Sequence, residues 1–333
     1  MPINLRVRFD RPQPTYYAGE TVTGHVLVHV DEPTPVRAIR IHIKGEARVQ
    51  FVSNRHGLNL FRIKAKGHKK HLNVKSCLVG GDSGEVMLNP GENEYPFQCL
   101  LPHTLPSSFV GKHGYISYTA TGVLQRPRGS GQKGAIGFCV VEPVDLNALP
   151  KSTEPIEMKN DKFFWCLWNK SGPLTMQLRA PRGGYTPGQT IPFQIQVDNA
   201  STYEVRKVRV TLQQFVSWYA ECENTYSDEK LVDIDLVDSQ VIGQDSKVFS
   251  HMITVPPTPP SYQNNKCELV KWKYYLRVCA VVGRGHFNLN ISAPLLIGTT
   301  PVGYQDGQTG IPHSNDSVPR GSPWTSTDEL LTK

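Results

Sequence analysis

An internal repeat constrains the fold of this chain more than any other feature of its sequence. When the sequence is shifted by 169 residues, Tyr16–Val22 (YYAGETV) lies over Tyr185–Ile191 (YTPGQTI). The same shift places Val36–Ile43 (VRAIRIHI) over Val205–Leu212 (VRKVRVTL) without a gap. Self-similarity at one fixed offset is the signature of a repeated structural unit. The sequence therefore predicts two copies of one domain.

Each copy has the pattern of a series of β-strands. Val26, Val28 and Val30 alternate with His25, Leu27 and His29, and Ile39, Ile41 and Ile43 alternate with Arg40, His42 and Lys44. This period of two is typical of a strand with one buried face. Turn sequences such as Asn89–Glu92 (NPGE) separate the segments, and no segment shows a helical period over three turns. We therefore predict an all-β fold of two β-sandwich domains in tandem.

These patterns divide the chain into four parts. The two domains are expected at 1–150 and 172–303, joined by a linker at 151–171 that contains the aromatic run Phe163–Trp168 (FFWCLW). Residues 304–333 hold mainly Gly, Ser, Thr, Asp and Pro and have little to bury, so we expect a disordered tail.

Apolar runs and cysteines indicate the compartment. No apolar run approaches the roughly 18 residues of a membrane-spanning helix, and the charged start MPINLRVRF lacks the apolar stretch of a signal peptide. The seven cysteines are odd in number and form no Cys-x-x-Cys pair, which argues against a disulfide framework and a zinc ribbon. We expect a reducing compartment, the cytosol.

The positive charge is concentrated in the first half of the chain. Residues 1–150 hold 18 Lys and Arg against 11 Asp and Glu, whereas the remainder, with 18 of each sign, is neutral. The excess is densest in Arg62–Lys75 (RIKAKGHKKHLNVK), within a stretch from Ala47 to Gly81 that contains no acid. Such asymmetry points to anionic partners.

Two interpretations of this basic stretch are open. It is either an exposed hairpin whose charges keep it soluble, or a patch that binds anionic phospholipid or phosphate, because each Lys or Arg at an anionic membrane contributes about 1 kcal/mol. Nucleic acid is a poorer partner because stacking aromatic residues are not interleaved with the charges. The patch would consist of Arg62, Lys64, Lys66, Lys69, Lys70 and Lys75.

A catalytic site has little support in the sequence. Gly81–Gly84 (GDSG) resembles the nucleophile turn of trypsin-like proteases, but the acid-free stretch before it leaves no well-placed partner for a triad. A hydrolase using Ser83 is therefore a remote alternative. No glycine-rich phosphate loop precedes a helix, so nucleotide chemistry is not expected either. We predict no enzymatic activity and no cofactor.

Two pairs of histidines are candidate metal ligands. His25 and His29 share one face of a predicted strand, but the second copy has no histidine at the corresponding positions. The two lysines between His68 and His71 would repel a cation. We therefore predict no metal site.

The sequence also contains one short recognition motif. Pro259, Pro260 and Tyr262 form a Pro-Pro-x-Tyr sequence, which WW domains bind in an extended conformation. The motif lies between two predicted strands and not in a free tail. We favour a rigid structural turn over a WW-domain ligand.

Two cysteines flank the predicted strand Val270–Ala280. Cys279 shares a strand face with Lys273 and Arg277, and these cations would lower the pKa of an exposed thiol. Cys267 and Cys279 are therefore candidate redox thiols, and ordinary sheet cysteines are the alternative.

The motifs taken together resemble the arrestin-domain-containing proteins, the α-arrestin family, over about Leu5–Val302. The similarity lies in both halves and in the same order along the chain. It is carried by Tyr17–Gly24 (YAGETVTG), Asn89–Glu92, Leu101–Phe109 (LPHTLPSSF), Gly114–Tyr118 (GYISY), Gly184–Gly188 (GYTPG), Asn199–Ser201 (NAS), Pro256–Ser261 (PPTPPS) and Pro294–Pro301 (PLLIGTTP).

This resemblance implies two arrestin-like, immunoglobulin-like sandwiches and an adaptor role. Members of the family engage cytoplasmic regions of membrane proteins at the plasma membrane or endosomes and link them to ubiquitination, endocytosis and transport. They recruit HECT-type ubiquitin ligases through Pro-Pro-x-Tyr motifs in a C-terminal tail, and 301–333 has no such motif. The alternative is a soluble scaffold or signalling regulator without a cargo role.

Overall fold

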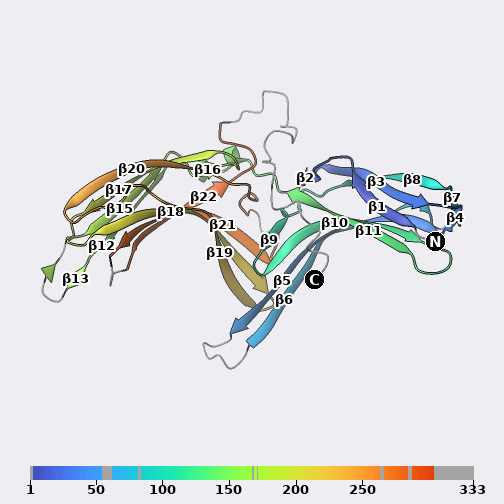
Figure 1. Ribbon diagram of the computed structural model, residues 1–333, viewed down its shortest axis with the longest axis horizontal. Coiled ribbons are helices and arrows are strands. Elements are labelled where there is room, and N and C mark those ends of the chain that lie inside the picture. Colours follow the sequence, from blue (N-terminus) through green and yellow to red (C-terminus); the bar gives the residue numbers. More distant parts are fainter. Residues whose placement is uncertain are drawn as a thin grey trace.

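The chain forms two β-sandwiches that lie one after the other along the long axis of the molecule (Figure 1). The structure is a computed structural model. It describes residues 3–54, 62–81, 84–166, 169–170, 172–262, 266–283 and 287–303. The predicted tail, 304–333, lies outside the described residues.

The first sandwich packs a smaller sheet on a larger one. The smaller sheet has the order β1-β3-β8, the larger has the order β2-β11-β10-β5-β6, and β9 pairs with β10 while β4 pairs with β7. Its strands are β1 (Asn4–Phe9), β2 (Thr15–Tyr17), β3 (Thr21–Val30), β4 (Thr34–Val36), β5 (Ala38–Asn54), β6 (Arg62–Gly80), β7 (Val86–Leu88), β8 (Gly91–Leu100), β9 (Phe109–Gly111), β10 (Gly114–Gln125) and β11 (Gln132–Val141).

The second sandwich has the same plan. Its smaller sheet has the order β12-β15-β17-β20, its larger sheet has the order β16-β22-β21-β18-β19, and β13 pairs with β14. A 3-10 turn (Leu146–Ala148) and a short helix, α1 (Pro150–Thr153), precede it. Its strands are β12 (Ile156–Lys162), β13 (Trp165–Cys166), β14 (Asn169–Lys170), β15 (Leu174–Ala180), β16 (Gly184–Tyr185), β17 (Thr190–Asn199), β18 (Val205–Ala220), β19 (Glu223–Asp235), β20 (Asp245–Thr254), β21 (Val270–Val282) and β22 (Leu289–Ile297).

The structure confirms the predicted duplication, and the repeated sequence motifs occupy matching places in the two sandwiches. In both larger sheets a short first strand pairs in parallel with the last long strand, β2 with β11 and β16 with β22. The Tyr-x-x-Gly turns that follow β2 and β16 place Gly19 at φ 100° and Gly188 at φ 85°, a conformation that glycine adopts without a steric penalty. Along β5, Ile39, Ile41 and Ile43 are buried while the alternate residues face solvent, as the period of two predicts.

The predicted linker needs a correction. Seven of its residues form β12, which pairs with β15 from Ile156↔Ala180 to Lys162↔Leu174 and belongs to the second sandwich. The strand was missed because it lies at a sheet edge and buries only Ile156 fully, so its sequence (IEMKNDK) is mostly polar.

This strand makes the lower boundary of the second domain testable. A fragment 154–303 is expected to melt cooperatively, whereas 172–303, which lacks β12, should be less stable by about 3 kcal/mol, or roughly 10 °C, because burial of Ile156 and one sheet edge is lost. Circular dichroism melts of the two fragments measure the difference. Equal melting temperatures would show that β12 is dispensable.

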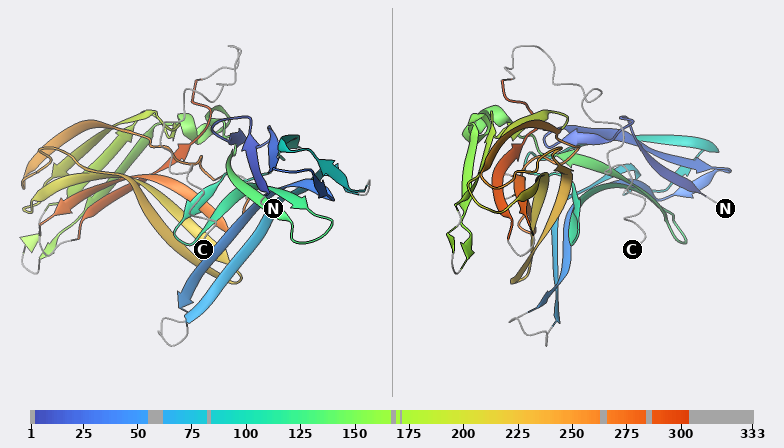
Figure 2. Two further views of the ribbon diagram at one scale, coloured as in Figure 1. Left: turned by 45° about the vertical axis from the view of Figure 1, so that its right-hand side comes forward. Right: turned by 60° about the vertical axis from the view of Figure 1, so that its left-hand side comes forward.

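An aromatic cluster joins the two sandwiches. The Phe109 ring of β9 stacks on Trp272 with ring centroids 4.5 Å apart, and it meets Trp218 edge-on at 5.9 Å. All three side chains are buried. Beside this cluster the β5–β6 and β18–β19 hairpins project together from the centre of the molecule (Figure 2), and the Ser53 hydroxyl on β5 donates to the Glu223 carboxylate on β19 at 2.7 Å.

Ion pairs reinforce this contact. Lys266, in the segment before β21, lies 2.9 Å from the Glu142 carboxylate and donates to the carbonyl oxygen of His103, also at 2.9 Å. The side chain of Glu142 is 5% exposed and that of Lys266 is 16% exposed. A third contact joins Lys69 on β6 to Glu268 at 2.9 Å. Among the described residues, the two sandwiches are therefore joined by an apolar cluster and by ion pairs and hydrogen bonds.

Candidate functional site

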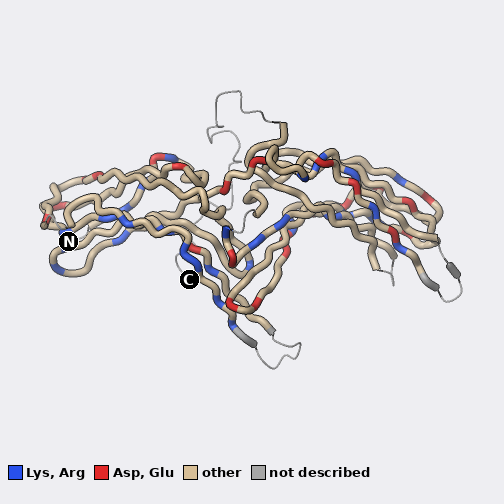
Figure 3. Tube along the Cα trace, turned by 180° about the vertical axis from the view of Figure 1, so that it is seen from behind, with Lys and Arg blue, Asp and Glu red and all other residues tan. Residues whose placement is uncertain are grey.

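Lys and Arg residues are frequent along β5 and β6 in the larger sheet of the first sandwich (Figure 3). The strand register places most of them on its solvent-facing side. Residues directly opposite each other in antiparallel strands share a face of the sheet. The register places Gln50 opposite Lys66, Arg48 opposite His68 and His42 opposite Lys75. This surface, called the basic face below, holds Arg40, Lys44 and Arg48 on β5, Lys64, Lys66, Lys70 and Lys75 on β6, and Lys133 on β11.

A β-bulge keeps the lysines of β6 on one face. The register shifts between Gly45 and Glu46, so that Leu72 lies opposite Gly45 and Lys70 lies opposite Glu46. His71 is the extra residue, and it moves Lys75 onto the same face as Lys70 although their spacing is odd. A bulge of this kind re-aims the side chains that follow it. Without it, strict alternation would place Lys75 on the buried side.

Glu46 is the one carboxylate on the basic face among the described strands of this sheet. It lies 2.6 Å from Lys44, 3.2 Å from Arg48 and 2.8 Å from His68. Burial raises the pKa of Glu46, but the hydrogen bonds from Lys44 and His68 and the charges of Lys44 and Arg48 outweigh burial and leave the pKa below its usual value. Glu46 therefore stays ionised and holds the side chains of Lys44, Arg48 and His68 in place in the middle of the basic face.

The other cations of the face have no such partner. Lys64, Lys66, Lys70 and Lys75 are exposed, and none of them makes an ion pair within the part of the chain that the structure describes. Arg40 and Lys133 are likewise exposed and unpaired there. A sheet that presents cations without counter-charges produces a positive potential over a flat area. The arrangement suits a broad anionic surface better than a single small anion.

The structure divides the residues that the sequence predicted for this patch. Lys64, Lys66, Lys70 and Lys75 share the basic face, whereas Lys69 points to the opposite side and pairs with Glu268. Lys69 therefore needs removing from the predicted set, because strand alternation separates it from Lys70. The side chain of Arg62 lies outside the described residues.

Sequence reasoning missed half of the basic face. Arg40, Lys44 and Arg48 lie outside the basic stretch but alternate with buried residues along β5. Their period of two was a usable signal, because the polar positions of a half-buried strand all point to the same side. Lys133 could not have been placed without knowing that β11 pairs with β10 opposite Val123.

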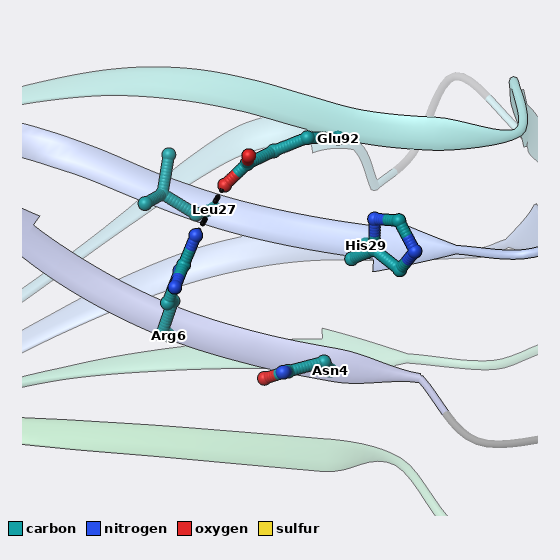
Figure 4. Close-up of a pocket in the computed structure, with 5 residues that line it drawn as sticks. All are labelled: Asn4, Arg6, Leu27, His29 and Glu92. Atoms are coloured by element: carbon teal, nitrogen blue, oxygen red, sulfur yellow. Dashed lines mark hydrogen bonds and ion pairs between the residues drawn. The ribbon is translucent and has the colours of Figure 1, made fainter.

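A shallow pocket lies over the smaller sheet of the first sandwich (Figure 4), lined by Asn4, Arg6, Leu27, His29 and Glu92. Its two opposite charges already meet, since Arg6 donates to Glu92 at 2.7 Å and holds the pKa of that carboxyl below its usual value. The pocket offers a ligand little charge, and we assign it no function.

Within the described residues, no three His, Cys, Asp or Glu side chains are placed to hold a metal ion. Ser83, the residue of the remote hydrolase alternative, lies outside the described residues. No helix in the described part of the chain is long and apolar enough to cross a membrane.

The Pro-Pro-x-Tyr motif lies inside the second sandwich. Pro259 and Pro260 are buried, and their carbonyl oxygens accept hydrogen bonds from Tyr274 at 2.7 Å and from the Trp272 indole at 2.8 Å. The Tyr262 hydroxyl donates to the carbonyl of Cys267 at 2.5 Å and accepts from its amide at 3.0 Å. Burial raises the pKa of Tyr262 to about 12. The polar groups of the motif are therefore engaged in hydrogen bonds within the second sandwich.

We expect the intact protein not to bind WW domains, because exposing Tyr262 would break these hydrogen bonds and its ring contact with Trp272. A free peptide covering 255–266 carries no such constraint and is expected to bind with micromolar affinity. Titration of both against the same WW domains tests this, with a Tyr262→Ala peptide as the control. Micromolar binding by the folded protein, lost in Tyr262→Ala without a change in melting temperature, would contradict the prediction.

The two candidate redox thiols need a correction. Cys267 is fully buried, and burial raises the pKa of its thiol. Burial also raises the pKa of Cys279, and the nearby charges of Arg209 and Arg277 do not reverse this. A reactive cysteine needs exposure and a lowered pKa, and neither residue has both. Sequence alternation showed the neighbouring cations of Cys279 but not the depth at which its sulfur lies.

Comparison with known proteins agrees with the architecture. The family model of the arrestin (or S-antigen) N-terminal domain matches residues 5–147, and that of the C-terminal domain matches residues 170–302. Arrestin domain-containing protein 4 is 29% identical in Homo sapiens and 30% identical in Mus musculus, over 88% of this chain and 70% of each relative. Arrestin domain-containing protein 17 of Caenorhabditis elegans is 26% identical over 89% of this chain and 70% of its own length. With both domain models matched in order across two sandwiches of the same plan, this chain belongs to the arrestin family, among the arrestin-domain-containing proteins or α-arrestins.

Proposed function

We propose that this protein is a non-catalytic adaptor of the cytosolic membrane face. In this role it binds cytoplasmic regions of membrane proteins and links them to ubiquitin-dependent endocytosis, transport and signalling. Membership of the arrestin family supports the adaptor class. The basic face is the observation that carries the membrane part of the proposal.

The basic face supplies the membrane contact by simple electrostatics. Cytosolic leaflets carry anionic phospholipids, and each lysine held near such a surface contributes about 1 kcal/mol. Lys64, Lys66, Lys70 and Lys75 lie along one strand, so several can meet the same surface together. Their combined contribution is enough for reversible binding, which suits a protein that must reach and leave its cargo.

Recruitment of a ubiquitin ligase is the less direct part of the proposal. HECT-type ligases are the expected partners, but the internal Pro-Pro-x-Tyr motif is engaged in the fold. We therefore propose that a ligase is reached through a second protein or through another surface of this chain.

Proximity labelling in living cells tests the adaptor role. The intact chain, fused to a labelling enzyme, is expected to label membrane proteins and ubiquitination enzymes. A variant with Lys64, Lys66, Lys70 and Lys75 changed to Ala should lose the membrane proteins. A labelled set of soluble proteins only, identical for both forms, would support the alternative of a soluble scaffold or signalling regulator and overturn the proposal.

A further inference from the structure

The internal repeat identifies a second surface equivalent to the basic face. The same shift of 169 residues places Phe215 on β18 over Glu46 on β5. Both lie on the solvent-facing side of the larger sheet in their sandwich. The two copies thus present the same face with different chemistry, because an ionised carboxylate among cations is replaced by a phenyl ring.

Aromatic rings gather around this position in the second sandwich. Phe215 stacks on Tyr226 of β19, with centroids 5.4 Å apart and planes at 24°. Tyr226 is 54% exposed, and Lys271 lies over the ring of Tyr219 at 5.4 Å. Phe215 and Tyr219 are half-buried beside Tyr226, and a contiguous apolar patch on a protein surface marks an interaction site. We call Phe215, Tyr219, Tyr226, Lys271 and Lys273 the aromatic face.

Unpaired positive charge adjoins these rings. Lys273 lies opposite Phe215, is exposed, and makes no ion pair with any residue that the structure describes. By contrast, the carboxylates further along the sheet are neutralised, Asp235 by Lys207 and Arg209. The aromatic face therefore offers an apolar platform beside a free cation.

We propose that the aromatic face binds an extended peptide segment in which an acidic residue neighbours a large apolar side chain. The apolar side chain would pack on Phe215 and Tyr226, and the carboxylate would pair with Lys273. The proposal rests on the proposed function, since such a segment would come from the cytoplasmic region of a membrane-protein cargo.

The geometry favours a peptide over a membrane or a nucleic acid. Phe215 and Tyr226 come from neighbouring strands and stack on each other, so one apolar side chain of a peptide can contact both rings. Asp228 lies on the same surface, on the side of Phe215 away from Lys273, so it would repel a continuous phosphate backbone and leaves an acidic residue favoured only beside Lys273. Charge complementarity at Lys273 then selects an acidic segment.

The probe is a fluorescent peptide in which a Leu-Phe pair is flanked by Asp and Glu. Binding is measured by anisotropy in the variant that lacks Lys64, Lys66, Lys70 and Lys75, so that capture of the acidic peptide by the basic face is reduced. Tyr226→Ser and Lys273→Ala are each expected to weaken binding at least fivefold. Lys159→Ala, on an exposed position of the other sheet, should leave it unchanged.

Control peptides and vesicles separate the outcomes. Replacing the Leu-Phe pair by Ser-Ser, or the acids by their amides, should also weaken binding at least fivefold. Peptide binding that ignores Tyr226→Ser and Lys273→Ala would overturn the inference, as would an effect of these changes on anionic vesicles and not on the peptide. The peptide assay uses a variant without the four lysines of the basic face. Failure of this protein to bind membranes would therefore contradict the proposed function without contradicting peptide binding at the aromatic face.

Discussion

Replacing Lys64, Lys66, Lys70 and Lys75 with Ala is expected to weaken binding to anionic vesicles by about 500- to 1000-fold. Each lysine contributes about 1 kcal/mol at an anionic surface, and about 1.4 kcal/mol corresponds to a factor of ten. Co-sedimentation with vesicles containing phosphoinositides, over a range of lipid concentrations, measures the change. Wild-type binding should also fall steeply with salt, because exposed charges are screened over roughly 8 Å at physiological ionic strength.

The neighbouring lysines provide the sharpest control. Lys70→Ala should weaken vesicle binding about fivefold, whereas Lys69→Ala should leave it nearly unchanged, because Lys69 points away and pairs with Glu268. Glu46→Gln removes the carboxylate of the face and should strengthen binding about fivefold. Equal losses from Lys69→Ala and Lys70→Ala would show that net charge, and not the basic face, governs binding.

Lys266→Met is expected to destabilise the protein by about 3–5 kcal/mol near neutral pH, because it leaves the Glu142 carboxylate buried without its partner. Burial already raises the pKa of Glu142, and Lys266 offsets part of that effect. A carboxyl whose pKa is higher in the folded than in the unfolded state binds its proton more tightly when folded. Stability of the variant should therefore recover as the pH falls through that raised pKa.

Chemical denaturation at several pH values measures this effect. Lys151→Met removes an exposed lysine of α1 and should change stability by less than about 0.5 kcal/mol. The double variant Glu142→Gln, Lys266→Met buries no lone charge and should recover most of the loss. If Lys266→Met and Lys151→Met have the same small effect at every pH, the ion pair does not hold the domains together.

Much of the fold followed from patterns that are local in the sequence. The alternation at Ile39–Ile43 predicted β5, and the shift that aligns it with Val205–Leu212 predicted β18. The sequence did not predict β12, because an edge strand needs few apolar residues and its polar sequence resembles that of a linker. The local sequence pattern therefore identifies strands with one buried face. Edge strands such as β12 are recognised only from their pairing with a neighbouring strand.

The candidate site depended more heavily on long-range pairing. The sequence marks 62–75 as a strongly basic stretch, but its lysines cannot be sorted by face without the bulge at His71. The partner of Lys69 lies on the other sandwich, far along the chain at Glu268. Likewise, the depth of Cys267 follows from the packing of its loop and not from its neighbours in sequence.

The aromatic cluster between the sandwiches gives the protein an optical probe of its own. The protein has five tryptophans, and two of them, Trp218 and Trp272, are buried against Phe109 where the two sandwiches meet. Any rearrangement that parts the sandwiches would bring these indoles into water and shift their fluorescence to longer wavelengths. Intrinsic emission, recorded while vesicles or peptides are added, can therefore report whether a ligand on one face changes the relation of the two sandwiches, with no label attached.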